Sequence, residues 1–382
     1  MIRILHVLKR YSSNYPLLNE MVRLDSNKFQ SFVYYLEGRS DGRNEIEGLA
    51  RDVFYDSSKP HGRIYSATKK AHSLSKIIDK NEVDIINCHL EKTMPIGVLA
   101  SMLSKRKPKI VTTVHGLEGL EGDAEYDLRK KIKNYFFYRF LDKVICVSNS
   151  IKSDVIKNSI GNISDKVGSV QNGLVFDRFS SVISKEEAKQ KILPSSKSEL
   201  FWFGTVGRLA KVKNHKNMIA AFRSVVDKNP RCLLLLVGDG PLREELSTWV
   251  DALKLTENVL FLGKRGDVPD ILKALDVFLF PSYREGLPLA MLEAMASGLP
   301  VIASDIPVVR EVLGDENVGG LVDPDDPSAM ANVMLTLLEL SREELKHMGE
   351  RAKARAVNNF SADRMVRNYE TLYEQIYNHE SG

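Results

Sequence analysis

Residues 280–305 read FPSYREGLPLAMLEAMASGLPVIASD, and this stretch decides the fold class. An apolar run ends near Pro281, a polar loop follows, and a helix is predicted from about Pro288 to Ser297 before a second short apolar run. Proline in the first helical turn and Gly298 just after the last one are typical helix boundaries. A strand, a loop, a helix and a strand in this order predict one unit of a parallel α/β sheet.

The same alternation of short apolar runs and longer helical segments extends over the whole chain, and each half has enough strands for its own doubly wound sheet. The polar stretch 176–200 predicts a boundary between two domains, residues 1–180 and 181–361. The predicted strands are 2–8, 31–36, 83–88, 109–114 and 143–147 in the first half, and 201–206, 232–237, 259–262, 277–280 and 301–303 in the second.

Composition narrows the class of protein. The chain has 382 residues, of which 43% are hydrophobic and 27% charged, values that are typical of a globular protein with ordinary cores. Its three cysteines, Cys88, Cys146 and Cys232, are far apart, which argues against a disulfide framework or a zinc site and favours a reducing cytoplasm. The apolar run at the N-terminus is too short for a signal peptide, and no run approaches a membrane span.

Charge is distributed unevenly. The net charge is +4, with +8 on residues 1–180 and −4 on the remainder. A basic half is consistent with an anionic membrane surface or with a solvated surface that has no partner, whereas the acidic second half argues against a nucleic-acid partner. Residues 129–143, RKKIKNYFFYRFLDK, predict a basic, aromatic helix. Either this helix lies on an anionic bilayer through cations such as Lys130, Lys131 and Lys133, or its aromatic face packs on the first sheet.

Polar residues follow several predicted strands, where parallel sheets bind their ligands, so we expect a cleft between the two domains. The loop at 285–288 enters a helix, whose first N–H groups favour a diphosphate. Glu293 lies inside the apolar helix LAMLEAMA, where a carboxylate needs a partner. That partner is either a ligand or a nearby Arg or Lys.

The pair Glu285 and Glu293, set in PSxxEGLPLxxLEAMAxGxPVIASD, resembles the signature of the retaining glycosyltransferases of family 4, which have the GT-B fold of two Rossmann-like domains facing across a cleft. The resemblance extends to GRL at 207–209, LLLLVGDGP at 233–241, VLFLG at 259–263 and DVFLFPS at 276–282. The first half adds TVHG at 113–116, VSNSI at 147–151 and QNG at 171–173. The resemblance implies that a C-terminal helix, about 362–382, packs back on the first domain.

The resemblance also implies roles for individual residues. Arg208 and Lys213 would bind the donor diphosphate and offset the charge of the leaving group without a metal. Glu293 would bind the ribose hydroxyls, and Glu285 would lie beside the donor sugar. His115 would face the transferred sugar, with His89 as a second candidate. The predicted donor-binding set is completed by Gly207, Arg265, Gly286, Leu287 and Pro288.

The activity that this resemblance implies is retaining, metal-independent transfer of a sugar from a UDP- or GDP-sugar, with no cofactor. The acceptor would be a glycan or a lipid-linked glycan in bacterial cell-envelope polysaccharide or lipopolysaccharide synthesis, at the inner face of the cytoplasmic membrane. Transfer to a small soluble acceptor and nucleotide-sugar epimerisation are the alternatives. Residues 9–16, KRYSSNYP, depart from the family because a glycine-rich turn is usual there; Lys9, Arg10, Ser12 and Ser13 could supply side-chain donors instead.

Overall fold

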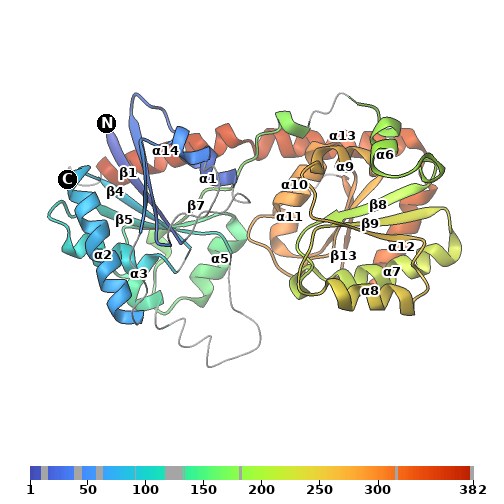
Figure 1. Cartoon of the computed structure of the whole chain (residues 1–382), viewed down its shortest axis with the longest axis horizontal. Coiled ribbons are helices and arrows are strands. Elements are labelled where there is room, and N and C mark those ends of the chain that lie inside the picture. The colour runs from blue at the N-terminus through green and yellow to red at the C-terminus, as the bar shows by residue number, and fades with distance from the viewer. Residues whose placement is uncertain are drawn as a thin grey trace. The chain divides into compact units, whose positions relative to one another are not determined.

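The computed structural model describes residues 1–9, 16–37, 45–56, 63–90, 92–116, 132, 134–179, 183–314 and 317–378. By their internal contacts these residues belong to two compact units, Met1–Gly173 with Ala362–Gly382, and Leu174–Ser361 (Figure 1). The chain therefore passes from one unit to the other twice. We call them unit 1 and unit 2.

Unit 1 is built on a parallel sheet with the strand order β3-β2-β1-β4-β5-β6-β7 among the described residues. The strands are β1 (Ile2–Leu8), β2 (Phe29–Tyr35), β3 (Asp52–Tyr55), β4 (Ile85–His89), β5 (Lys109–Val114), β6 (Lys143–Cys146) and β7 (Val167–Ser169). The helices are α1 (Pro16–Met21), η1 (Glu45–Gly48), α2 (Arg63–Lys80), α3 (Met94–Leu103), α5 (Asn149–Asn158), η2 (Ser164–Lys166) and α14 (Ala362–Asn378).

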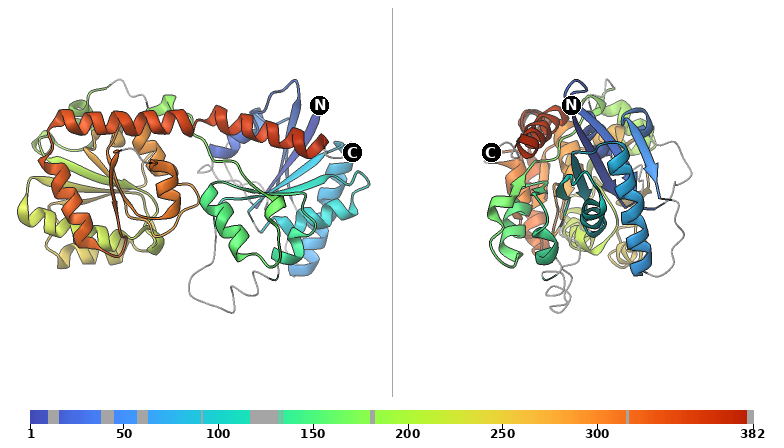
Figure 2. Two further views of the ribbon diagram at one scale, coloured as in Figure 1. Left: turned by 180° about the vertical axis from the view of Figure 1, so that it is seen from behind. Right: turned by 90° about the vertical axis from the view of Figure 1, so that its left-hand side faces the viewer.

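The C-terminal helix α14 belongs to unit 1, although unit 2 lies between it and the rest of unit 1 in the sequence. In Figures 1 and 2 it is the red helix that lies across the strands of this unit, close to α1. Tyr369 and Tyr373 are buried, and Asn87 on β4 donates a hydrogen bond to the Tyr373 hydroxyl at 2.8 Å. An ion pair of 3.0 Å joins Lys28 to Glu374. The helix thus completes one face of the sheet.

Unit 2 is built on a second parallel sheet, with the strand order β10-β9-β8-β11-β12-β13. The strands are β8 (Phe201–Val206), β9 (Cys232–Val237), β10 (Val259–Gly263), β11 (Val277–Phe280), β12 (Val301–Ser304) and β13 (Gly319–Val322). The helices are η3 (Asp177–Phe179), α6 (Lys185–Ile192), η4 (Ser195–Lys197), η5 (Lys211–Lys213), α7 (His215–Lys228), α8 (Arg243–Ala252), α9 (Val268–Ala274), α10 (Leu289–Ala296), α11 (Pro307–Leu313), α12 (Pro327–Glu339) and α13 (Arg342–Asn359).

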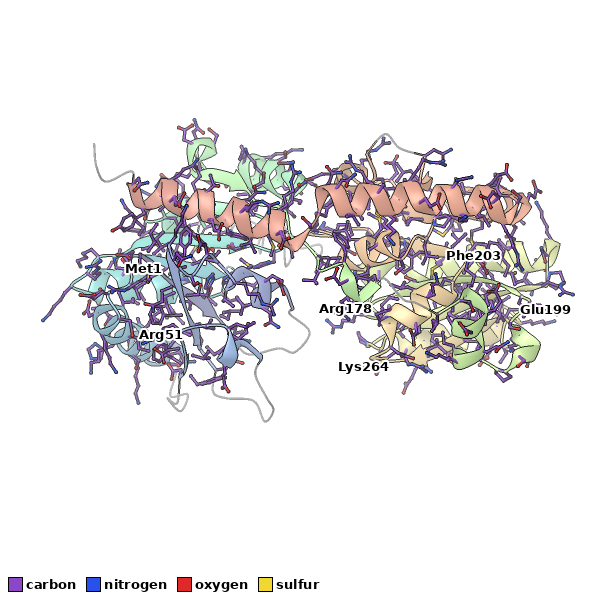
Figure 3. The ribbon with its side chains drawn as sticks, turned by 90° about the horizontal axis from the view of Figure 1, so that it is seen from above. Met1, Arg51, Arg178, Glu199, Phe203 and Lys264 are labelled. Carbon is purple, nitrogen blue, oxygen red and sulfur yellow. The ribbon has the colours of Figure 1, made fainter. Side chains whose placement is uncertain are left out.

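The core of unit 2 follows from its sequence. All six residues of β9, CLLLLV, are buried, as expected for a central strand of a parallel sheet covered on both faces. Phe203 on β8 is paired in register with Leu234 and packs against Phe222 of α7. Figure 3 shows Phe203 inside the unit and Glu199, just before the same strand, at its periphery.

The strands predicted from apolar runs are present, but three short strands were missed. β3, β7 and β13 are edge strands of three or four residues with few buried side chains, so they lack the apolar pattern that identifies a strand. Edge strands have a neighbour on one side only and need less apolar surface. The fold class, an α/β fold with two parallel sheets, is confirmed.

The stretch 176–200 contains more structure than its polar composition predicted. α6 begins with a capping box between Ser184 and Glu187, and Lys189 from this helix donates to Asp276 at 2.9 Å. Residues 174–179, assigned to the first domain from sequence, lie in unit 2, where Leu174 forms a parallel bridge with Ser361.

One close contact in unit 2 gives a test of its packing. Gly349 on α13 is so near Gly298 that a Cβ atom would overlap the Gly298 carbonyl oxygen. We expect Gly349→Ala to lower the free energy of unfolding by about 1–3 kcal/mol, because the helix must move away from a backbone that cannot yield. Gly266→Ala is the matched control, since a Cβ atom there meets nothing within 4 Å. Equal urea midpoints for the two variants would contradict this account.

Candidate active site

The polar residues of unit 2 gather where its strand order reverses. β8 has β9 on one side and β11 on the other, so the loops after β8 and β11 run in opposite directions at their carboxyl ends. In open parallel sheets this point is where ligands bind. The loop after β8 carries Arg208 and Lys213, and the loop after β11 carries Glu285.

Backbone contacts fix the loop after β8. A Cβ atom on Gly238, which has φ +131°, would overlap the carbonyl oxygen of Gly207, and one on Gly240 would overlap the backbone of Leu209. The Gly207 N–H donates to Val237 at 2.9 Å, and the Leu209 N–H donates to Asp239 at 3.1 Å. The two turns therefore pack backbone against backbone, which requires glycine at these positions.

Lys213 and Glu285 contact each other directly. The Lys213 Nζ atom lies 2.6 Å from Glu285 Oε1, and it also lies over the Phe280 ring at 5.4 Å from the centroid. The side chains are 24% and 14% exposed, so the ion pair is partly shielded from water. Asn214, with φ +52°, turns the chain from Lys213 into α7 and donates to the Pro324 carbonyl oxygen at 2.7 Å.

The loop that carries Glu285 is anchored by Tyr283, which the sequence analysis did not single out. Its N–H donates to the Val212 carbonyl oxygen at 2.8 Å, and its hydroxyl donates to Asp325 at 2.9 Å. Asn217 on α7 donates to the same hydroxyl at 3.2 Å. These contacts join segments far apart in the sequence, so no local pattern indicates them.

Arg208 differs from Lys213 in its surroundings. Its side chain is exposed, and among the described residues it forms no ion pair. Gly207 and Gly286 are half-buried and Leu287 is buried. Pro288 precedes the first turn of α10 and its carbonyl oxygen accepts from Met291 and Leu292. Among the described residues, no carboxylate would compete with an incoming anion for Arg208.

Glu293 lies on α10 and is largely buried. Burial raises the pKa of its carboxyl group, and the positive charge of Arg178 acts in the opposite direction. No described residue donates a hydrogen bond to this carboxylate, so the sequence-based alternative of a direct salt bridge is absent from the described part of the chain. Arg178 lies in η3 of the same unit and is labelled in Figure 3. It was not a candidate from sequence.

Arg265 is held by its own neighbour. Its guanidinium donates two hydrogen bonds to Asp267, at 2.8 and 2.6 Å. No contact in the described chain joins it to Lys213 or Glu285. The described partner of Arg265 is thus Asp267, and its role in donor binding stays a prediction.

His115 follows β5 in unit 1, next to the point at which the strand order of this sheet reverses, between β1 and β4. Its Nε2 atom lies 3.1 Å from Nδ1 of His89, the last residue of β4, and Nε2 of His89 lies 3.0 Å from Nδ1 of His6 on β1. Burial lowers the pKa of His115 and of His6 to about 3. His6 was missed because a single histidine in an apolar strand gives no signal of its own.

Two other predicted features are only partly described. Lys9 forms an ion pair of 3.2 Å with Glu37, while Arg10, Ser12 and Ser13 lie outside the described residues. Lys130, Lys131 and Lys133 also lie outside them. Within the described chain, no group of three or more His, Cys, Asp or Glu side chains is arranged to hold a metal ion.

Two units, each built on a parallel sheet with polar residues at its switch point, are the architecture of the GT-B class. The family model described as Glycosyl transferases group 1 matches residues 184–355, and the model described as Glycosyltransferase Family 4 matches residues 17–178. A relative from Escherichia coli, UDP-Gal:alpha-D-GlcNAc-diphosphoundecaprenol alpha-1,3-galactosyltransferase, is 32% identical and aligns over 94% of each chain. This chain therefore belongs to the group 1 glycosyltransferases and is a glycosyltransferase.

Other matches agree with this family. N-acetyl-alpha-D-glucosaminyl L-malate synthase from Bacillus anthracis is 29% identical over 80% of this chain and 78% of its own length. Among solved structures, HepE from Anabaena in complex with UDP-glucose has a TM-score of 0.80 at 22% identity and covers 98% of this chain and 100% of its own. The structural likeness confirms the GT-B fold.

The ion pair between Lys213 and Glu285 gives a test that separates stability from activity. We expect Lys213→Met to lower the free energy of unfolding by about 1–3 kcal/mol, because Glu285 stays largely buried without its cation. Arg208→Met should change it by less than about 0.5 kcal/mol, since Arg208 is exposed and unpaired among the described residues. Urea unfolding measures both, and Lys213→Met combined with Glu285→Gln should recover part of the loss.

The effects of these variants on turnover should not follow their effects on the free energy of unfolding. If both cations offset charge on the leaving diphosphate, each single variant should lower kcat on the order of 100-fold or more. Wild-type turnover in either folded variant would refute its predicted role, and equal destabilisation by both would refute the ion-pair account.

Proposed function

We propose that this chain is a retaining, metal-independent galactosyltransferase that uses UDP-galactose and extends an α-N-acetylglucosaminyl diphospholipid. The observation that carries the proposal is the alignment with the E. coli galactosyltransferase, which runs over 94% of both chains at 32% identity. An alignment of this extent includes both sheets and both switch points. The product would be a lipid-linked disaccharide for a cell-envelope glycan.

The donor side of this reaction is assigned to unit 2. The bond between the sugar C1 atom and the diphosphate oxygen breaks, and negative charge develops on the departing UDP. Arg208 and Lys213 supply two cations from one loop, and a fixed cation is most effective where charge develops in a water-poor site. Glu293 accepts hydrogen bonds from the ribose hydroxyls, which supply the donors that its carboxylate lacks among the described residues.

Donor binding also changes the ion pair described above. Lys213 forms an ion pair with Glu285. A diphosphate is a stronger partner for an ammonium group than one carboxylate, because it offers more charge and more oxygen acceptors. In this proposal Lys213 turns to the diphosphate, and Glu285 becomes available to hydroxyl groups of the sugar.

The proposal is tested with a matrix of donors and acceptors. Purified protein in EDTA receives UDP-galactose, UDP-glucose, UDP-N-acetylglucosamine or GDP-mannose, together with α-N-acetylglucosaminyl diphosphate on a short lipid, or with L-malate. We expect transfer of galactose to the lipid acceptor, with an α linkage by NMR. Loss of activity in EDTA with rescue by magnesium or manganese would refute metal independence.

The remaining outcomes distinguish the alternatives. A β-linked product would refute retention. Transfer to L-malate alone would favour a small soluble acceptor, as in the named activity of the B. anthracis relative. Conversion of a nucleotide sugar with no acceptor present would favour an epimerase.

A surface of unit 1 supports contact with the membrane that holds such an acceptor. Residues 134–138 are helical, and the predicted packing of their aromatic face is only partly correct: Tyr138 is buried, whereas Phe136 and Phe140 are 57% and 40% exposed. Together with Tyr135 and the neighbouring Ile160, also exposed, these residues form what we call the aromatic patch. Among the described residues, no helix combines the length and apolar character needed to cross a bilayer.

Binding to lipid vesicles tests this surface. We expect the protein to co-sediment with vesicles that contain anionic lipid, and less so in high salt, because exposed cations such as Arg139 contribute roughly 1 kcal/mol each near the surface. Phe136→Ser combined with Phe140→Ser should weaken binding, while Val357→Ser, on an exposed position of α13, should not. Equal binding to neutral vesicles, or none to either, would count against membrane contact.

A further inference from the structure

The three histidines of unit 1 form a continuous row. His6 comes from β1, His89 from the end of β4, and His115 follows β5, so three neighbouring strands each contribute one ring. Adjacent rings meet edge to edge and are roughly coplanar, with centroids 5.3 and 5.4 Å apart and planes inclined by 28° and 22°. Two nitrogen-to-nitrogen hydrogen bonds, of 3.0 and 3.1 Å, join the row from end to end.

All three rings are neutral at physiological pH. Burial lowers the pKa of His6 and of His115 to about 3, and burial together with the two neighbouring rings lowers the pKa of His89 well below its usual value. A neutral imidazole has one N–H donor and one lone pair. Each hydrogen bond in the row therefore has a direction, and the direction of one sets the direction of the other.

Only two arrangements of protons satisfy both hydrogen bonds. In the first, His6 Nδ1 donates to His89, and His89 Nδ1 donates to His115 Nε2, so every ring has its proton on Nδ1. In the second, every ring has its proton on Nε2 and donates in the opposite direction. The arrangements differ at the two ends of the row, at Nε2 of His6 and at Nδ1 of His115.

The inner end favours the first arrangement. His6 is completely buried, and its Nε2 atom has no hydrogen-bond partner among the described residues. In the second arrangement this atom would be a buried N–H without an acceptor, which is rare and costly in proteins. In the first it is a lone pair without a donor, which proteins tolerate more readily. The row is then polarised from the interior toward His115.

We propose that His6 and His89 are positioning residues that hold His115 in the tautomer with its proton on Nδ1. The proposal rests on the assigned function in one respect, namely that His115 acts on the transferred sugar. An Nδ1–H group recognises a hydroxyl oxygen as an acceptor. A neutral ring also avoids placing a positive charge near a sugar whose C1 atom becomes electron-poor as the bond to the diphosphate breaks.

The tautomer is tested without any substrate. In protein labelled with ¹⁵N-histidine, long-range ¹H–¹⁵N correlation spectra distinguish the Nδ1–H, Nε2–H and charged forms, and His115→Gln assigns the signals. We expect His115 to give the Nδ1–H pattern at pH 7. An Nε2–H pattern, a charged ring or an averaged mixture would overturn the proposal, whatever the enzyme transfers.

Variants of the middle ring test the positioning role. His89→Leu removes the donor to His115, so we expect a mixed tautomer signal and a kcat for galactose transfer lower on the order of 10- to 100-fold, with a smaller change in donor KM. His89→Gln retains an amide donor and should recover part of the rate. His72→Leu, at an exposed position on α2, is the matched control and should change neither.

The two proposals fail separately in this design. An unchanged His115 spectrum in folded His89→Leu would refute the positioning role, even if transfer were lost. If no galactose transfer occurs in the wild type, the assigned function fails and the spectra still decide the tautomer. If His89→Leu does not fold, His6→Leu replaces it, and an unchanged His115 spectrum in that variant would refute the positioning role. The wild-type spectrum still decides the tautomer.

Discussion

The contact on which the loop of Arg208 and Lys213 depends is the approach of two backbones, at Gly207 with Gly238 and at Leu209 with Gly240. With no side chains between them, the turns after β8 and β9 lie as close as two main chains can, and their N–H and C=O groups bond each other. Leu209 is fully buried and fixes the depth of its turn. Arg208, next to it in sequence, is exposed.

The apolar pattern of the sequence predicted the central strands of each sheet. Its motifs singled out candidate site residues one by one, and their roles stay predictions. The sequence did not predict which of these residues contact one another. Continuous apolar runs identify central strands because both faces are covered, whereas β3, β7 and β13 lack that pattern at the edges. Glu285 and Lys213 were both candidates, yet their ion pair joins positions 72 residues apart. The row of histidines was missed for the same reason, because it depends on strand order and register rather than on spacing.

The two switch points use opposite electrostatics. In unit 2 the site has formal charges: an exposed Arg208, an ion-paired Lys213, and Glu293, whose pKa burial raises. In unit 1 the site is a row of neutral rings whose polarity comes only from hydrogen-bond direction. This division suits a reaction in which a highly charged group departs from a neutral sugar.

The return of α14 to unit 1 has a consequence for biosynthesis. The chain leaves the ribosome from its N-terminus, so residues 174–361 are complete before Tyr373 is made. Until then Asn87 lacks the hydroxyl to which it donates at 2.8 Å, and Lys28 lacks Glu374. One face of the sheet in unit 1 therefore lacks α14 until the whole of unit 2 has been translated. The unit whose synthesis begins first is thus the last to be completed. A nascent chain that ends before α14 contains all of unit 2 but lacks the last helix of unit 1.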